Sequence, residues 1–188
     1  MAKGNTKTNV SLSQEKYVAF LRGINITGNR VIKSVDLKDC FEKMGFGNVV
    51  IVLASGNVIF TSRISDLEKI KATIEAGLGK RFHYPAKAVI FRIPDLMNIV
   101  KKYPFGAPSD DVHHYVIFLA EDISKELTTG VAIDNKLDLV ATGANVIYWQ
   151  VKKGGTVTTP FGKFIAKPKY RDSITTRNMN TLHKIIAK

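Results

Sequence analysis

The sequence predicts an α+β protein made of two halves, each built around an antiparallel sheet. Strand-like and helix-like segments follow one another in the order β, α, β, β, α, β over residues 16–92. The order β, α, β, β recurs beyond residue 112. Between the two regions, residues 103–111 concentrate Pro, Gly and Asp, which is typical of a boundary.

The first half opens with a strand and a helix. Residues 16–22 (KYVAFLR) are rich in the aromatic and β-branched side chains that favour strands. Ser34 is predicted to be the N-cap of a helix, because apolar residues follow it at helical spacing until Gly45 ends the pattern. Residues 48–54 and 58–62 then form a hairpin joined by a Ser-Gly-Asn turn.

A second helix and a fourth strand complete this half. The apolar stripe of the helix consists of Ile64, Leu67, Ile70, Ile74 and Leu78. Gly77 and Gly79 are expected to fray its end, and residues 86–92 form the strand. The resulting βαββαβ order is the ferredoxin-like pattern, in which the fourth, first, third and second strands lie side by side. A short helix near residues 96–100 follows.

The second half repeats this pattern in a degenerate form. Residues 113–120 read as a strand, residues 124–131 as a helix, and residues 137–141 and 145–151 as a hairpin turning at Gly143. Further helical segments are expected at residues 160–166 and 180–187. We therefore predict a disordered polar arm over residues 1–15, a ferredoxin-like half over 16–104 and a C-terminal α+β half over 105–188.

The composition favours a protein of the cytoplasm. Cys40 is the single cysteine, so no intramolecular disulfide can form, as is usual in a reducing compartment. The polar residues 1–16 lack the apolar stretch of a secretory signal. No segment approaches the ~18 consecutive apolar residues of a membrane span, so no membrane partner is expected.

The net charge of +12 is distributed unevenly. Residues 1–104 hold 17 Lys and Arg against 8 Asp and Glu, residues 105–151 hold 2 against 7, and residues 152–188 hold 9 against 1. A basic tail of this kind favours nucleic acid or another anionic partner, but the same charge can serve solubility alone. The charge leaves both interpretations open.

Two polar loops are predicted to meet at one end of the first sheet. Because the first and third strands are antiparallel neighbours, the end of the first lies beside the beginning of the third. The loop over residues 22–30 (RGINITGNR) and the turn over residues 55–57 (SGN) therefore converge near the start of the first helix. The connection that carries Arg81, His83 and Tyr84 is expected at the same end.

These loops have the residue types of an anion-binding site. Arginines, flexible glycines and the free N–H groups of a helix start suit phosphate or carboxylate. The candidate ligand-binding residues in the two loops are Arg22, Gly23, Asn25, Gly28, Arg30, Ser55, Gly56 and Asn57. Alternatively, the glycines serve turn geometry, the Asn and Ser side chains satisfy the backbone, and the arginines are solvated.

Several other kinds of site are excluded or disfavoured by the pattern. The glycines before Lys163 miss the P-loop spacing, and no G-x-G-x-x-G occurs. Neighbouring His113 and His114 point to opposite faces of a strand, which disfavours a shared metal. Cys40 lies on an apolar helix stripe, as a small core residue does. We predict no metal, no cofactor and no catalytic residue.

The stretches FLRGINITGNR and ASGNVIFTS, together with Thr175 to Thr181 (TTRNMNT), resemble the signature of domain of unknown function family 1697. That family has L-R-G-I-N-V-G-G, Q-S-G-N-V and T-x-R-N-W-x-T segments; here Thr27, Ala54 and Met179 depart from them. The resemblance implies two ferredoxin-like halves and a bacterial source, and brings no activity or cofactor with it. It adds Arg177 and Asn178 to the candidate site.

Three functions stay open at this point. The first is binding of a small anion at the two loops, with Arg177 and Asn178 contributing. The second is nucleic-acid binding through the basic tail, although strands that are apolar on both faces argue against an open base-stacking platform. The third is catalysis, which the absence of an acid from the cluster disfavours. Alternatively, the polar cluster is a buried lock between the halves. The oligomeric state is not predicted.

Overall fold

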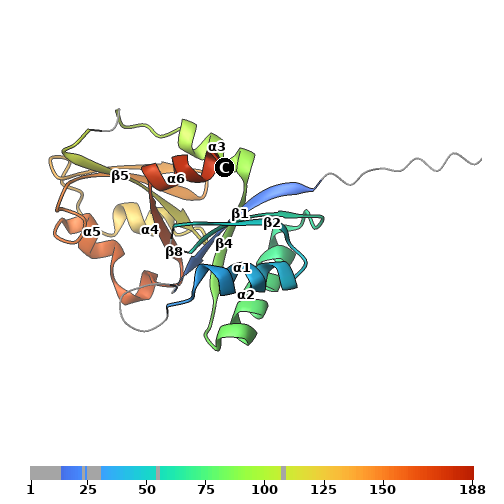
Figure 1. The fold of residues 1–188 in the computed structure, drawn as a ribbon. Helices are drawn as coiled ribbons and strands as arrows, with labels where there is room; N and C mark the ends of the chain where they lie inside the picture. The colour runs from blue at the N-terminus through green and yellow to red at the C-terminus, as the bar shows by residue number, and fades with distance from the viewer. Residues whose placement is uncertain (1–13, 23, 25–30, 54–55, 107–108) are drawn as a thin grey trace, which may run out of the picture.

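The computed structural model describes residues 14–22, 24, 31–53, 56–106 and 109–188 (Figure 1). It contains two four-stranded antiparallel sheets with helices between their strands, so the predicted fold class is confirmed. Residues 1–13 of the predicted arm and the candidates Gly23, Asn25, Gly28, Arg30 and Ser55 lie outside the described residues, whereas Glu15, predicted to belong to the arm, is the first residue of a strand. Within the described part, no helix is long and apolar enough to cross a bilayer.

The N-terminal half has the predicted topology. Its sheet has the order β2-β3-β1-β4, with every neighbouring pair antiparallel. Helices α1 and α2 pack on one face of this sheet, around Phe41, Ile74 and Leu78 (Figure 1). The elements are β1 (Glu15–Arg22), α1 (Ser34–Lys43), β2 (Gly47–Val52), β3 (Asn57–Ser62), α2 (Leu67–Phe82) and β4 (Lys87–Arg92).

The ends of both helices differ from the predictions. Lys33, and not Ser34, occupies the N-cap of α1, and no side chain bonds to the helix start there. Asp66 caps α2 by accepting from the backbone N–H groups of Glu68 and Lys69, so the helix starts later than Ile64. Gly77 and Gly79 do not fray α2, which continues to Phe82, and the Met44 side chain packs where a Cβ of residue 77 would stand.

The C-terminal half repeats the same strand order, β6-β7-β5-β8. This half contains all four strands and both helices of the βαββαβ pattern. It is degenerate only in that helices α4 and α5 are short, with 6 residues each. Strand β8 was not predicted, because its sequence ITTRN is short and polar, and pairing with β5 makes it a strand. The remaining elements are α3 (Ile93–Lys101), β5 (Val112–Leu119), α4 (Ser124–Thr129), β6 (Asp138–Gly143), β7 (Val146–Lys152), α5 (Pro160–Ile165), the 3₁₀ turn η1 (Pro168–Tyr170), β8 (Ile174–Asn178) and α6 (Met179–Ile186).

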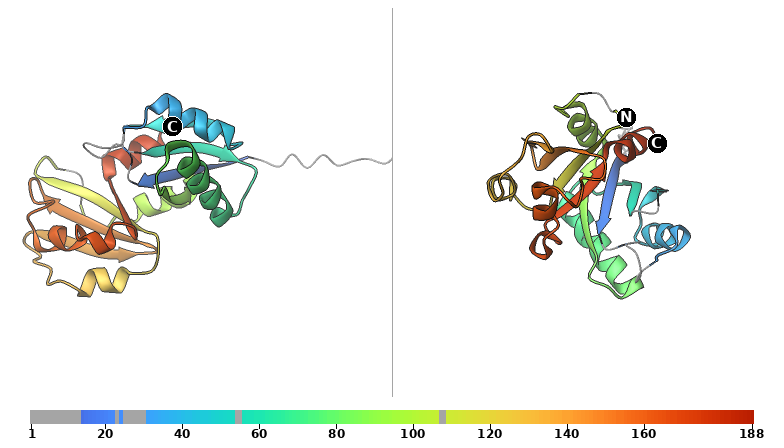
Figure 2. Two further views of the ribbon diagram at one scale, coloured as in Figure 1. Left: turned by 90° about the horizontal axis from the view of Figure 1, so that it is seen from below. Right: turned by 90° about the vertical axis from the view of Figure 1, so that its left-hand side faces the viewer.

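The two halves share a core. One face of each sheet contributes to a single apolar cluster, which α3 and α6 complete (Figure 2). At its centre, the rings of Phe20 and Phe118 lie 4.6 Å apart, and Phe91 packs 5.0 Å from Phe118. The other face of the second sheet packs on α4 and α5 around Trp149 and Phe161. Both sheets are therefore covered on both faces.

Because Phe118 is fully buried between the halves, Phe118→Ala is expected to lower the free energy of unfolding by about 4 kcal/mol. Urea denaturation measures this loss. Trp149 fluorescence, which reports on the C-terminal half, and far-UV circular dichroism should show coincident transitions, since the halves share one core. Met97→Ala, at a side chain 49% exposed, is the control and should change little. Separate transitions for the two probes in the wild-type protein would contradict a shared core.

Candidate functional site

The end of β1 lies beside the start of β3, which brings Arg22 close to the 55–57 turn. The backbone N–H of Leu21 donates to the carbonyl of Gly56 at 2.7 Å, and Phe20 pairs with Asn57. Gly56 has φ +72°, and a Cβ there would lie 3.2 Å from Leu21. Glycine is therefore required for this close approach. Arg22 itself pairs with Lys87 at the start of β4.

Arg177 reaches from β8 across to this point in the other half. Its Nε donates to Oδ1 of Asn57 at 2.5 Å and its Nη2 to the carbonyl of Leu21 at 3.2 Å. Its Nη1 donates to Oγ1 of Thr175 and to the carbonyl of Thr176, at 2.8 and 2.9 Å. The planar fork of the guanidinium thus joins acceptors on both halves, as only an arginine can.

Asn57 and Phe20 hold the other side of this contact. The Asn57 side chain is fully buried, and its Nδ2 donates to the carbonyl of Val52 at 2.8 Å, which orients Oδ1 toward Arg177. The Arg177 guanidinium carbon lies 5.1 Å from the centre of the Phe20 ring, within the range of a cation–π contact. The predicted polar network between the halves is therefore built chiefly by Arg177.

The two arginines at this seam repel each other. Desolvation and the nearby charge of Arg22 lower the pKa of Arg177 to about 10, so it stays protonated at neutral pH. Burial likewise lowers the pKa of Arg22, with Arg171 lowering it further and Asp172 acting in the opposite direction. Two guanidinium groups are thus held close together in a partly desolvated place, where an anion would relieve their repulsion.

Arg22 differs from Arg177 because one of its guanidinium nitrogens makes no hydrogen bond to the described residues. Its Nη1 is buried and has no hydrogen-bond partner within the described residues. It also forms no ion pair with a described carboxylate. A guanidinium N–H that is removed from water without a partner is costly, so this group is a candidate for a ligand contact.

Arg22 and Arg177 line a groove of about 600 Å³ at the seam between the halves. Two further cationic residues, Lys167 and Arg171, lie on its C-terminal side, in the segment that links α5 to β8. Apolar side chains also line it, from both halves: Leu21, Ile24, Trp149, Val157, Ile165 and Ile174. Lys33 and the start of α1 do not line this groove.

A buried carboxylate positions the C-terminal wall of the groove. Oδ1 of Asp138 accepts from Nε1 of Trp149 at 2.8 Å and from Oγ1 of Thr159 at 3.0 Å. Thr159 in turn caps α5 by accepting from the N–H of Gly162 at 3.2 Å. Trp149 and Gly162 are both groove residues, so this network fixes the wall.

Asn178 does not lie with Arg177, because consecutive strand residues point to opposite faces. Its Oδ1 accepts from the backbone N–H of Asn180 at 2.9 Å and caps α6. It lines a separate cavity of about 690 Å³ together with His113 and His114. His114 is buried and stacks on Tyr103, with ring centres 5.1 Å apart, whereas His113 is partly exposed.

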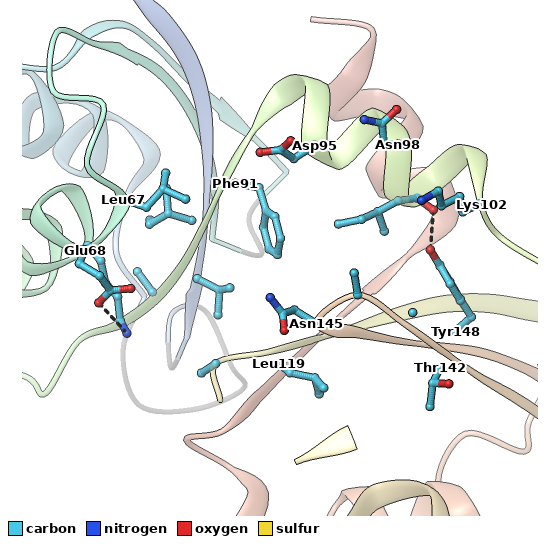
Figure 3. A pocket seen from close by; sticks show the side chains of 18 residues that line it. Leu67, Glu68, Phe91, Asp95, Asn98, Lys102, Leu119, Thr142, Asn145 and Tyr148 are labelled. Atoms are coloured by element: carbon cyan, nitrogen blue, oxygen red, sulfur yellow. Dashed lines mark hydrogen bonds and ion pairs between the residues drawn. The ribbon is translucent and has the colours of Figure 1, made fainter. Parts of the chain in front are cut away.

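A larger cleft of about 730 Å³ lies on another side of the seam, between β4, α3 and the β6–β7 hairpin (Figure 3). Glu68 and Lys71 form an ion pair across 3.8 Å in it, and the Tyr148 hydroxyl donates to the carbonyl of Ile99. Its charged lining residues are of both signs, and none of the candidate residues predicted from the sequence lines it. Its size alone does not make it the better candidate.

The other residues singled out from the sequence have structural roles. His83 adopts a left-handed conformation, φ 53°, and ends α2, and Tyr84 is buried in the first core. Cys40 is buried in the same core, where burial raises its pKa, as expected for a core residue. Lys167 and Arg171 were not among the candidate residues predicted from the sequence. The only signal for them was the basic run KPKYR, which looked like part of a charged tail.

The model of a family described as "Protein of unknown function (DUF1697)" matches residues 14–148. The chain belongs to this family. The family predicted from the RGIN, SGN and TRN segments is therefore confirmed. The match covers β1, the β2–β3 hairpin and the start of β7, and ends before the DUF1697 chain reaches Arg177.

One solved structure supports the same fold for this DUF1697 chain. A conserved bacterial protein from Streptococcus pneumoniae matches with a TM-score of 0.78 and 21% identity, over 93% of this chain and 98% of that chain. An unknown protein from Galdieria sulphuraria matches with a TM-score of 0.27 and 11% identity, over 88% of this chain and 96% of that one. The first likeness concerns the fold, and the second is too weak to carry an argument. A comparison with curated proteins gave no match.

Replacing Arg177 should lower the stability of the whole fold. Arg177→Met leaves Asn57 Oδ1 and the Leu21 carbonyl without this donor, which should lower the free energy of unfolding by about 3 kcal/mol. Arg177→Lys keeps the charge but not the planar fork, so it should restore little of this loss. Urea denaturation measures both. Arg63→Met, at an exposed position, is the control, and an Arg177→Lys variant of wild-type stability would refute the role of the fork.

Acid should destabilise the protein partly through His114. Burial lowers the pKa of His114 below its ordinary value of 6.5. The unfolded chain therefore takes up this proton first, so the stabilising contribution is complete above about pH 6.5 and falls as the pH drops toward the lowered pKa. Chemical denaturation at pH 7.5 and at pH 5.5, about one unit above and below the ordinary pKa, measures the stability lost on acidification. This loss should be smaller in His114→Phe than in the wild-type protein. Equal losses in the two proteins would contradict this account.

Proposed function

We propose that this protein binds a small anion, of phosphate or carboxylate type, in the seam groove, the 600 Å³ groove lined by Arg22 and Arg177. The observation that carries the proposal is the buried, unpartnered Nη1 of Arg22 at the wall of a groove with further cationic residues. An anion placed there supplies the missing acceptor. Burial is the main cause of the lowered pKa of both arginines, and an anion would also offset the repulsion that Arg177 experiences from Arg22.

The two arginines have different parts in this proposal. Arg177 is committed to acceptors on both halves, so it acts as a fixed positive charge at the back of the groove. Arg22 donates to the ligand directly, and the exposed Lys167 and Arg171 attract it from the rim. Gly56 contributes by allowing β1 and the hairpin to approach closely. Asn178, which lines another cavity, has no part in this site.

The other two functions have less support. Base stacking needs an exposed sheet face with aromatic residues, and both sheets are covered on both faces by helices or by the opposite half. Acid–base catalysis needs a suitable group facing the ligand, and the groove residues include no Asp, Glu or His. The basic charge of the chain is consistent with binding a small anion as well as with binding nucleic acid.

Removing the Arg22 guanidinium should weaken anion binding while the fold survives. Loss of one charge-assisted hydrogen bond predicts that Arg22→Gln raises the Kd for pyrophosphate by about 10- to 100-fold. Isothermal titration calorimetry measures the affinity, and urea denaturation checks the fold.

The exposed Arg63, changed to Gln, provides the matched control, because it removes the same charge away from the groove. An effect of similar size in Arg63→Gln would show that only net charge matters. Failure of the wild-type protein to bind phosphate, pyrophosphate or citrate at low salt would refute the proposal. Steeply salt-dependent retention of DNA or RNA in that case would favour nucleic-acid binding instead.

A further inference from the structure

The seam groove has an apolar part beside its cationic part. Leu21, Ile24 and Ile174 line it and are buried, and Ile165 and Val157 line it from the C-terminal half. Val157 is 70% exposed and lines the same groove as these buried aliphatic side chains. An exposed valine alone is ordinary, but Val157 belongs to a contiguous apolar lining, which makes it a candidate for ligand contact.

The size of the groove exceeds what an inorganic anion needs. Its volume of about 600 Å³ falls within the range of about 300–1,000 Å³ that is usual for pockets of small organic molecules. A single water occupies only about 30 Å³ of liquid volume, and a bare phosphate is a few times larger. A phosphate on Arg22 would therefore leave most of the groove, including its apolar wall, in contact with water.

The apolar wall is held rigidly. Asp138 binds Trp149 and Thr159, and Thr159 caps the helix that carries Ile165. On the opposite side, Leu21 is fixed by the Gly56 carbonyl and by Arg177. A preformed apolar surface of this kind contributes to affinity without an ordering cost, provided that the ligand presents an apolar group to it.

We infer that the ligand is an amphipathic anion: a phosphate or similar head group joined to an apolar or aromatic body about the size of a nucleoside. This inference rests on the proposed anion site and specifies the class of molecule that the site takes. The head group lies against Arg22, with Lys167 and Arg171 at the rim. The body lies along Ile165 and Val157.

A panel of four phosphates tests the inference by titration calorimetry of the whole chain. Inorganic phosphate has no body, glucose 6-phosphate has a polar one, AMP an aromatic one and hexyl phosphate an aliphatic one. AMP, hexyl phosphate or both should bind at least about tenfold more tightly than the other two, since burying apolar surface adds roughly 1.4 kcal/mol or more. The tighter of the two identifies whether the body is aromatic or aliphatic.

A substitution at Val157 tests the apolar part of the groove independently of its cationic part. Val157→Ser should weaken the tighter apolar ligand about fivefold and leave inorganic phosphate unchanged. Val35→Ser is the matched control, because Val35 is 78% exposed and does not line the groove. Because both valine side chains are mostly exposed, neither substitution should disturb the fold.

The outcomes distinguish this inference from the proposed function. If all four phosphates bind equally and Arg22→Gln weakens them all, the anion site stands and the apolar body is refuted. If AMP and hexyl phosphate bind more tightly but Val157→Ser changes nothing, the apolar contact is not in this groove and the inference fails. If none of the four binds, the inference fails, and the anion site fails with it if pyrophosphate and citrate do not bind either.

Discussion

The contact of Arg177 with Asn57 and Leu21 is the interaction on which the arrangement of this molecule depends. It places a positive charge from the last strand of one half against a fully buried amide and a strand carbonyl of the other. The apolar core around Phe20 and Phe118 supplies attraction between the halves, but attraction between apolar surfaces has little directionality. The guanidinium fork, with acceptors on both sides, fixes the angle and register at which they meet.

The same contact explains why Arg22 is available. Arg177 donates to Oδ1 of Asn57 at the start of β3 and to the carbonyl of Leu21 at the end of β1. Arg22, the next residue, is left beside a second positive charge with a buried N–H unused. A structural lock and a candidate binding site are therefore adjacent parts of one arrangement, and not alternatives as the residue types alone had suggested.

Much of the fold followed from the sequence, because strand alternation and helix stripes are local patterns. The βαββαβ order also predicted that the end of β1 lies beside the start of β3. The hydrogen bond from the Leu21 N–H to the Gly56 carbonyl is formed at this place. Strand β8 carries no such local pattern, and the sheet alone imposes its conformation. Without β8, the alternation that turns Asn178 away from Arg177 could not be foreseen. Nor could the placement of Lys167 and Arg171, which depends on the chain path between α5 and β8.

The repeated strand order also makes the two halves comparable residue by residue. Leu119, at the end of β5, donates to the carbonyl of Asn145 in the second hairpin as Leu21 donates to Gly56 in the first. Counting along the paired strands from these leucines places Ala120 at the position of Arg22, and Phe91 at the position of Arg177. Phe91 packs on Phe118 at 5.0 Å, much as Arg177 lies over Phe20 at 5.1 Å. The 730 Å³ cleft is thus the internal counterpart of the seam groove, with an alanine and an aromatic ring in place of its two arginines. One architecture occurs twice in the chain, and only one copy has arginines at these two positions.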